Sequence, residues 1–121
     1  MRIETNTAKV FTIFDAPKLD PINVVMMDYG GGAGRLIVAC YGDSWTGYWG
    51  AMGTTLEDFV CSGEADYIAG KMEPQLGKRT KSKAAYLLRI VEAVREALRF
   101  NAEMTAAVRV DCPVFGLKGE K

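Results

Sequence analysis

INVVMMDYGGGAGRLIVACYGDSWTGYWGA, residues 22–51, is the stretch of this 121-residue chain that decides the fold. Apolar residues, many of them β-branched, fill most of 22–29 and 35–41, and glycine separates the two runs. Short apolar runs bounded by glycine are more often buried strands than helices. Because the loop between them, Gly30–Gly34, is short, the simplest pairing is an antiparallel hairpin. A phosphate-binding glycine loop would instead be followed by a helix, so we interpret this loop as a hairpin connection.

Residues 45–51 carry both tryptophans of the chain and predict a further strand. In a strand, Trp45 and Trp49 share one face with Gly47 between them, while Tyr48 lies on the other face. A helix would instead gather both indoles and the tyrosine, but each glycine inside a helix costs about 1 kcal/mol. We therefore favour the strand, in which glycine lets the backbone pack closely beneath an indole.

The rest of the chain adds one strand before the hairpin and helices after Gly53. Residues 10–14 are β-branched and aromatic, which indicates a first strand before the hairpin. Beyond Gly53, apolar residues recur at the i, i+3, i+4 spacing of a helix, and capping and breaking residues divide them into three helices. The expected elements are a helix capped by Thr54 or Thr55 and ended by Gly63, a helix over 65–72, a loop over 73–81, a helix from Ser82 to about Glu103, and an edge strand or packed extension within 105–115.

The helix predicted from Ser82 to Glu103 is apolar around most of its circumference. Its charged residues gather in one narrow stripe, and a helix of this kind must be covered on two or three sides. Either the sheet with the two short helices or a partner subunit would provide that cover. Arg95 lies inside the apolar arc, so we expect it to reach solvent or to find a carboxylate. The apolar arc consists of Ala84, Leu87, Leu88, Ile90, Val91, Val94, Ala97, Leu98 and Phe100.

These elements predict a single α+β domain over residues 1–121. A chain of this length buries roughly two-thirds of its unfolded surface, enough for a core without disulfides. The predicted architecture is an antiparallel sheet of three to four strands in the N-terminal half, followed by two short helices and one long C-terminal helix packed on one face. Apolar residues make up 49% and charged residues 25% of the chain, which excludes a wholly disordered protein.

Composition excludes several functional classes. The 15 basic and 15 acidic side chains cancel, so no overall field draws the protein to nucleic acid or an anionic membrane. Because histidine is absent, the usual zinc sites and histidine-dependent triads are excluded, and we predict no cofactor, metal or catalytic residue. Three widely spaced cysteines favour reduced thiols in a cytoplasm, and no apolar run is long enough for a signal peptide or a membrane span.

Two surfaces are candidates for contacting a partner. Tryptophan and tyrosine dominate interface hot spots and stack on bases, although the same residues also build cores. The aromatic stretch therefore offers either packing or a partner contact through Trp45, Tyr48, Trp49 and Met52. A compact basic run precedes the long helix, where cations are unfavourable for helix stability. It could contact a nucleic-acid backbone or an acidic partner, or stay solvated, and its residues are Lys78, Arg79, Lys81 and Lys83.

The aromatic and glycine residues also carry a resemblance to known proteins. The chain resembles small accessory proteins encoded by tailed phages and prophages, and the similarity spans nearly its whole length. The resemblance implies a gene product acting in the cytoplasm of an infected or lysogenic bacterium, and it implies no activity or site residue. The segments that carry it are Cys40-Tyr41-Gly42, Trp45-Thr46, Tyr48-Trp49-Gly50-Ala51-Met52-Gly53 (YWGAMG), Phe59-Val60-Cys61, Asp66-Tyr67-Ile68-Ala69, Lys71-Met72, Tyr86-Leu87-Leu88-Arg89-Ile90-Val91, Ala93-Val94 and Ala97-Leu98.

The leading hypothesis is a non-enzymatic phage accessory protein that binds a host or phage protein and works as a small homo-oligomer, such as a homodimer. A nucleic-acid-binding module that uses the basic run is the first alternative, and a steep salt dependence of binding would support it. A small enzyme with an unrecognised site is the second alternative. It requires a concave pocket with convergent polar groups near Asp43, Ser44 or the paired carboxylates Glu57/Asp58 and Glu64/Asp66.

Overall fold

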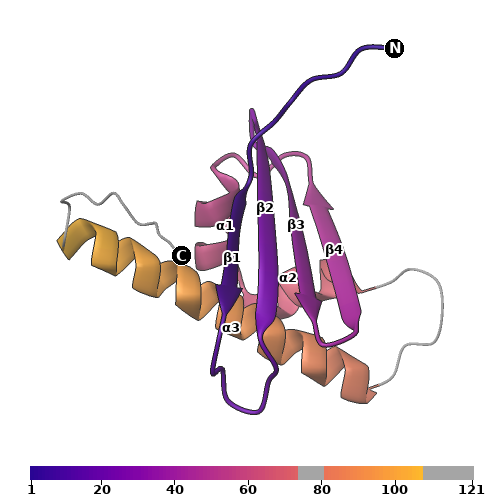
Figure 1. The fold of residues 1–121 in the computed structure, drawn as a ribbon, viewed down its shortest axis with the longest axis vertical. Coiled ribbons are helices and arrows are strands. Elements are labelled where there is room, and N and C mark those ends of the chain that lie inside the picture. Colours follow the sequence, from indigo (N-terminus) through magenta and orange to yellow (C-terminus); the bar gives the residue numbers. More distant parts are fainter. Residues whose placement is uncertain (74–80, 108–121) are drawn as a thin grey trace.

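A four-stranded antiparallel sheet forms one layer of the computed structural model, and the described helices form a second layer behind it (Figure 1). The structure describes residues 1–73 and 81–107. The predicted α+β class, with helices packed on one face of an N-terminal sheet, is confirmed. The elements in chain order are β1 (Lys9–Ile13), β2 (Ile22–Gly30), β3 (Ala33–Cys40), β4 (Asp43–Trp49), α1 (Leu56–Ser62), α2 (Ala65–Met72) and α3 (Lys81–Ala107).

The hairpin between β2 and β3 is tighter than its glycine content suggested. The predicted hairpin is confirmed, but the five-residue loop at Gly30–Gly34 is wrong, because Gly30 pairs with Ala33 across a two-residue turn. Both turn residues, Gly31 and Gly32, have positive φ angles of 63° and 85°. Two left-handed residues match the twist of the flanking strands, and glycine adopts this conformation without steric cost.

The core lies between the sheet and the helices. Side chains alternate along each strand, so every second residue points toward the helices. Across the β2 and β3 pair these residues are completely or almost completely buried, which places the apolar stripe of each helix against them. The buried core residues are Ile22, Val24, Met26, Leu36, Val38, Cys40, Trp49, Leu56, Val60, Ile68, Ala69, Met72, Leu87, Ile90, Val91, Val94 and Leu98.

Strand β4 places both indoles on one face, as predicted, and this is the face that the helices cover. Trp49 is 5% exposed, whereas Trp45 is half-buried and packs edge-on against the ring of Tyr86 with centroids 5.8 Å apart. A Cβ atom at Gly47 would lie 2.7 Å from Cη2 of Trp49 and 2.8 Å from Cγ of Met72. Glycine is therefore required at this position, and the predicted close packing of backbone beneath an indole is confirmed.

Helix α3 is covered by the sheet and the two short helices, which is one of the two arrangements expected. Phe100, placed in the covered arc by its spacing, is 62% exposed, so that prediction is wrong. Arg95 is half-buried, and its acceptors among the described residues are backbone carbonyls and not the expected carboxylate. Its Nε donates to the carbonyl of Val60 at 3.1 Å and its Nη2 to that of Cys61 at 3.3 Å. These carbonyls end α1, where a cation is favoured by the helix dipole.

Helix α1 begins as predicted, with Thr55 as its N-cap. The Thr55 hydroxyl accepts a hydrogen bond from the Asp58 backbone amide at 3.2 Å, and Gly63 follows the last turn. Helix α3 continues to Ala107, beyond the expected end near Glu103. Most of the predicted loop over 73–81, and the strand residues proposed beyond Ala107, lie outside the described residues. Within the described part of the chain, no helix is both long enough and apolar enough to span a bilayer.

Candidate functional site

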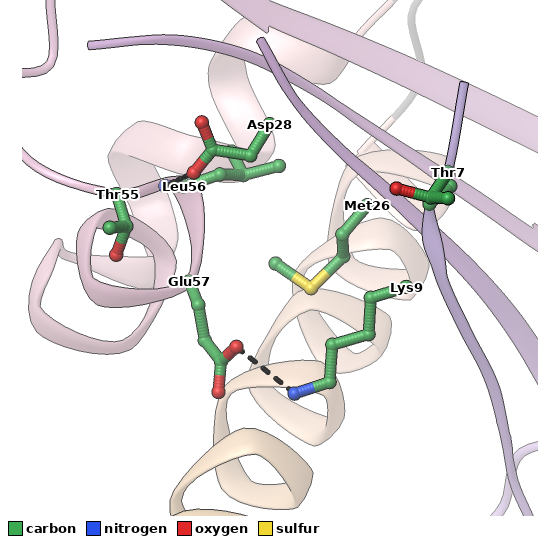
Figure 2. Close-up of a pocket in the computed structure, with 8 residues that line it drawn as sticks. Thr7, Lys9, Met26, Asp28, Thr55, Leu56 and Glu57 are labelled. Atoms are coloured by element: carbon green, nitrogen blue, oxygen red, sulfur yellow. Dashed lines mark hydrogen bonds and ion pairs between the residues drawn. The ribbon is translucent and has the colours of Figure 1, made fainter. Parts of the chain in front are cut away.

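A pocket of about 360 Å³ lies between the start of β1 and the start of α1 (Figure 2). Met26 and Leu56 give it an apolar floor, and charged and hydroxyl groups surround them. Glu57, a carboxylate in the first turn of α1, is one of the residues that line it. The lining residues are Thr7, Ala8, Lys9, Met26, Asp28, Thr55, Leu56 and Glu57.

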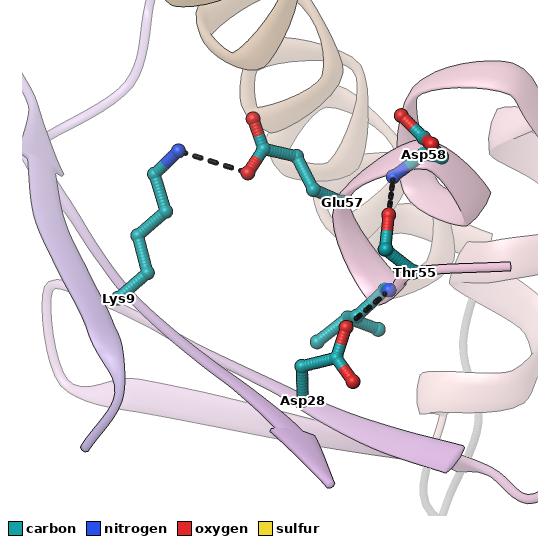
Figure 3. Close-up of polar contacts among 6 residues, drawn as sticks. Lys9, Asp28, Thr55, Glu57 and Asp58 are labelled. Carbon is teal, nitrogen blue, oxygen red and sulfur yellow. Dashed lines mark hydrogen bonds and ion pairs between the residues drawn. The ribbon is translucent and has the colours of Figure 1, made fainter. Parts of the chain in front are cut away.

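The polar groups of this pocket are occupied by contacts that hold α1 on the sheet (Figure 3). Lys9 donates from Nζ to Oε1 of Glu57 at 3.0 Å. Asp28 accepts from the backbone amide of Leu56 through Oδ2 and from that of Gly30 through Oδ1, both at 2.9 Å. These two hydrogen bonds, chiefly the one from Leu56, lower the pKa of Asp28. The Asp28 carboxylate is therefore unsuited to donating a proton near neutral pH.

The opposite face of the sheet is not covered by the described helices (Figure 1). At its centre are four half-buried apolar side chains, Val25, Met27, Ile37 and Ala39. Around them are more exposed residues with hydroxyl, amide and aromatic groups. We call this surface the open face. The strand registers, and for Tyr29 its contacts with Arg35 and Tyr48, define it as Val10, Thr12, Asn23, Val25, Met27, Tyr29, Arg35, Ile37, Ala39, Ser44, Thr46 and Tyr48.

Three residues of the open face form a connected cluster at the end nearest the glycine turn. Arg35 pairs across the strands with Met27 on one side and Tyr48 on the other. Its guanidinium carbon lies 5.3 Å from the ring centre of Tyr48, and its Nε donates to the Tyr29 hydroxyl at 3.3 Å. The two tyrosine rings are 6.4 Å apart and are each about half exposed. Among the described residues, no carboxylate forms an ion pair with Arg35.

The four aromatic-stretch candidates are divided between core and surface. Trp49 is buried in the core, Trp45 is half-buried on the same side, and Met52 is half-buried against the core. Tyr48 is the member that the structure places on the open face. Residues 22–29 are apolar on both faces of their strand, so sequence reasoning could not tell which face the helices cover. Tyr29 and Arg35 were missed for this reason, although the strand periodicity puts them on the same side as Tyr48.

The structure describes half of the predicted basic patch. Lys78 and Arg79 lie outside the described residues, whereas Lys81 and Lys83 are exposed in the first turn of α3. One turn further along, the Tyr86 hydroxyl donates to Sγ of Cys40 on the helix-covered side of the sheet. Lys81 and Lys83 therefore belong to the helical layer, and the structure does not bring them to the open face.

Comparison with known families gives the biological context. A phage family, Phage_phiTE_072, matches residues 1–81 of the 121. The chain belongs to this phage family. The matched part contains all four strands, α1 and α2, and therefore the complete open face and the pocket, whereas α3 begins at Lys81. Neither the curated proteins nor the solved structures gave a match.

Proposed function

We propose that this phage accessory protein binds another protein, of the host or of the phage, through the open face of its sheet. The proposed activity is non-enzymatic and takes place in the cytoplasm of the bacterial host. The uncovered apolar centre of the face carries the proposal, together with the cluster of Tyr29, Arg35 and Tyr48 beside it. An apolar centre inside a polar rim is the usual anatomy of a protein interface, and tyrosine, arginine and methionine are enriched there.

Charge favours a protein partner over nucleic acid. The open face carries one cation, Arg35, and no anion. Nucleic-acid binding draws its affinity from several lysine or arginine contacts to successive phosphates, which one guanidinium group cannot provide. The alternative that uses the basic run requires a different surface, because Lys81 and Lys83 lie in the helical layer.

The size of the face favours a transient complex. Four strands spaced about 4.8 Å apart, with roughly seven residues each, give a projected area of about 450 Å². A partner in a standard interface contributes about 800 Å². The open face is therefore small for a standard contact, and we expect the interface to extend beyond it or the complex to be transient.

The pocket chemistry supports a non-enzymatic role. Catalysis by acid and base groups needs a side chain that can exchange a proton at the working pH. Asp28 is held ionised by two backbone amides, and Glu57 is paired with Lys9. Both carboxylates thus serve to attach α1 to the sheet, and the pocket remains the place where an activity would be sought.

A photo-crosslinking experiment tests the proposed function. Photoreactive p-benzoylphenylalanine replaces Thr46 on the open face or, as a control, Glu92 on the exposed side of α3. The protein is produced in the bacterial host during phage infection, irradiated and purified, and its adducts are identified by mass spectrometry. We expect one discrete protein adduct from position 46 and none from position 92. An adduct with nucleic acid, or no adduct from position 46, contradicts the proposal.

Self-association of this chain stays a prediction, and the charge of the open face indicates which surface a homodimer would avoid. If two copies packed face to face, two Arg35 side chains would enter an interface that holds no carboxylate, which is unfavourable. We therefore expect any homodimer to use another surface. Sedimentation of the protein and of Ile37→Lys should give the same mass, and dissociation caused by that substitution would show that the open face is occupied by a second copy.

We also propose that the YWGAMG stretch is common to the proteins of this family because several of its residues are needed for the fold. Trp49 fills the core, and the half-buried side chain of Met52 packs against it. Gly53 has a positive φ of 75°, which favours glycine. Conservation of these three positions in further family members, with variation at Tyr48, would fit a structural role for the stretch. Loss of Gly53 or Trp49 in members that retain the sheet would contradict it.

A further inference from the structure

We infer that the protein partner presents a carboxylate to Arg35 from within an apolar segment, so that Tyr29, Arg35 and Tyr48 form the specificity-determining contact of the open face. This inference rests on the proposed function and adds the chemistry of the partner. It follows from the geometry of the guanidinium group, from its apolar surroundings and from the charge of the face.

The Arg35 guanidinium group is held in place with its outer donors available. Its Nε–H donates to the Tyr29 hydroxyl, which in turn contacts Sδ of Met27 at 3.9 Å. The ring of Tyr48 lies 5.3 Å from the guanidinium carbon, within the range of a cation–π contact. Each Nη atom carries two N–H groups, and no described residue accepts a hydrogen bond from them. Two parallel N–H groups are the geometry that a carboxylate accepts as a bidentate pair.

The hydrogen-bond acceptors of other arginines in the structure can be compared with those of Arg35. Arg95 and Arg99 donate to carbonyls at the end of α1, and Arg2 pairs with Glu4. Arg95 is half-buried like Arg35 and has two carbonyl acceptors, and the exposed Arg99 has one. Among the described residues, the half-buried Arg35 has only the Tyr29 hydroxyl as an acceptor. The structure thus fixes the orientation of the Arg35 cation while leaving its anion to be supplied from elsewhere.

The surroundings of Arg35 require that anion once a partner binds. Met27 lies across the strand from Arg35, and Ile37 lies two residues further along β3 on the same face. A partner that covers these apolar side chains also removes water from the guanidinium group. A buried cation without an anion is strongly unfavourable, whereas a bidentate carboxylate compensates for the lost hydration. An apolar partner segment without a carboxylate would therefore bind poorly here.

The same charges argue against the other occupants of this surface. A second copy of the chain offers no acidic residue on its own open face. A nucleic-acid strand presents a phosphate at every nucleotide, and the face offers one cation to receive them. A protein segment with one acidic side chain among apolar residues matches the face in both charge and hydrophobicity.

The experiment uses the protein identified by the crosslink from position 46, purified and titrated against the chain by calorimetry. The variants are Arg35→Gln, Arg35→Lys and Arg35→Glu. The matched control is Arg89→Gln, because Arg89 is an exposed arginine that also lies over a tyrosine ring, 5.9 Å from that of Tyr86, on the helical side. Thermal unfolding of each variant checks that the fold is retained.

We expect Arg35→Gln to weaken binding at least about tenfold and Arg35→Glu more, with Arg35→Lys between the wild type and Arg35→Gln. Arg89→Gln should stay within about twofold, since an exposed charge away from the interface contributes little. Replacing the mapped partner carboxylate with arginine should restore binding to Arg35→Glu.

Two failures can be told apart. If the complex forms but Arg35→Gln and Arg89→Gln bind equally well, the carboxylate inference is wrong while the proposed function stands. If position 46 yields no protein adduct, or an adduct with nucleic acid or a second copy, both are wrong.

Discussion

The two faces of the sheet are made by the same four strands and carry similar apolar residues, yet they have different environments. On the helix side, Val24 and Val38 are completely buried. Their chain neighbours on the open face, Val25 and Ile37, are half-buried without any described helix over them. For these pairs the difference comes from the position of the helices, since Val24 and Val25 are the same residue type. Apolar side chains on the open face therefore contribute less to folding, and under our proposal they contact the partner.

The largest effect is expected from truncating neighbours on opposite faces of β3. Leu36→Ala should lower the free energy of unfolding by about 2 to 5 kcal/mol, because it leaves a cavity in the core. Ile37→Ala removes a side chain of the same size from the open face and should cost less than about 1 kcal/mol. Urea denaturation of both variants measures the difference. Equal losses would show that the open face is also part of the core, which would break the comparison.

The next effect concerns the close approach of backbone and indole on the helix side. Gly47→Ala should destabilise the fold by about 1 to 3 kcal/mol, because the added methyl group overlaps Trp49 and Met72. Gly42→Ala is the control, since a Cβ atom there meets nothing within 4 Å. It should stay within about 0.5 kcal/mol of the wild type. Chemical denaturation checks both, and a tolerated Gly47→Ala would mean that the packing of β4 on α2 is looser than described.

A smaller loss of stability is expected where α1 is attached to α3. Arg95→Gln removes two charge-assisted hydrogen bonds to the α1 carbonyls and should cost about 1 to 2 kcal/mol. Arg89→Gln changes the same residue type on the exposed side of α3 and should cost less than about 0.5 kcal/mol. Thermal or urea unfolding measures both. Indistinguishable variants would show that Arg95 does not fix the helices against the covered face.

The smallest effect is a pH dependence of the contact between β2 and α1. Hydrogen bonds from Leu56 and then Gly30 lower the pKa of Asp28 below its ordinary value of 3.8. A carboxyl group whose pKa is lowered on folding stabilises the fold above its unfolded pKa, and this contribution is lost as the pH falls through its folded pKa. The wild type should therefore exceed Asp28→Asn in stability by a constant amount above about pH 5, and by less below pH 3.8. A difference that does not change with pH would contradict this role of the carboxylate.

The fold could be predicted from the sequence because its signals are local. Glycine punctuation and β-branched runs mark the strands, and Thr55 and Gly63 mark the ends of α1. The length of the Gly30–Gly34 loop was wrong because a strand can continue through glycine when a neighbour needs the space. A Cβ atom at Gly34 would lie 3.1 Å from Cβ of Leu56, a contact between segments that local sequence cannot show.

The candidate site could be predicted only in part. Tyr48 was named from its residue type, but Trp49 shares that type and is buried. Sequence periodicity separates the two faces of a strand without showing which face the helices will cover, because that depends on tertiary packing. The partner of Arg95 was missed for the same reason. The carbonyls of Val60 and Cys61 come from another helix, and nothing in the spacing of α3 places them there.

The claim that the partner binds the open face is tested most directly by placing the same substitution on each of the two layers. Ala39→Lys places a charge on the open face, and Ala85→Lys places it on the exposed side of α3. Both proteins are titrated against the partner identified by crosslinking, after unfolding curves confirm that each is folded. Ala39→Lys should weaken binding by at least about tenfold, while Ala85→Lys should leave it within about twofold. Equal affinities for the two variants would show that the open face is not the binding surface.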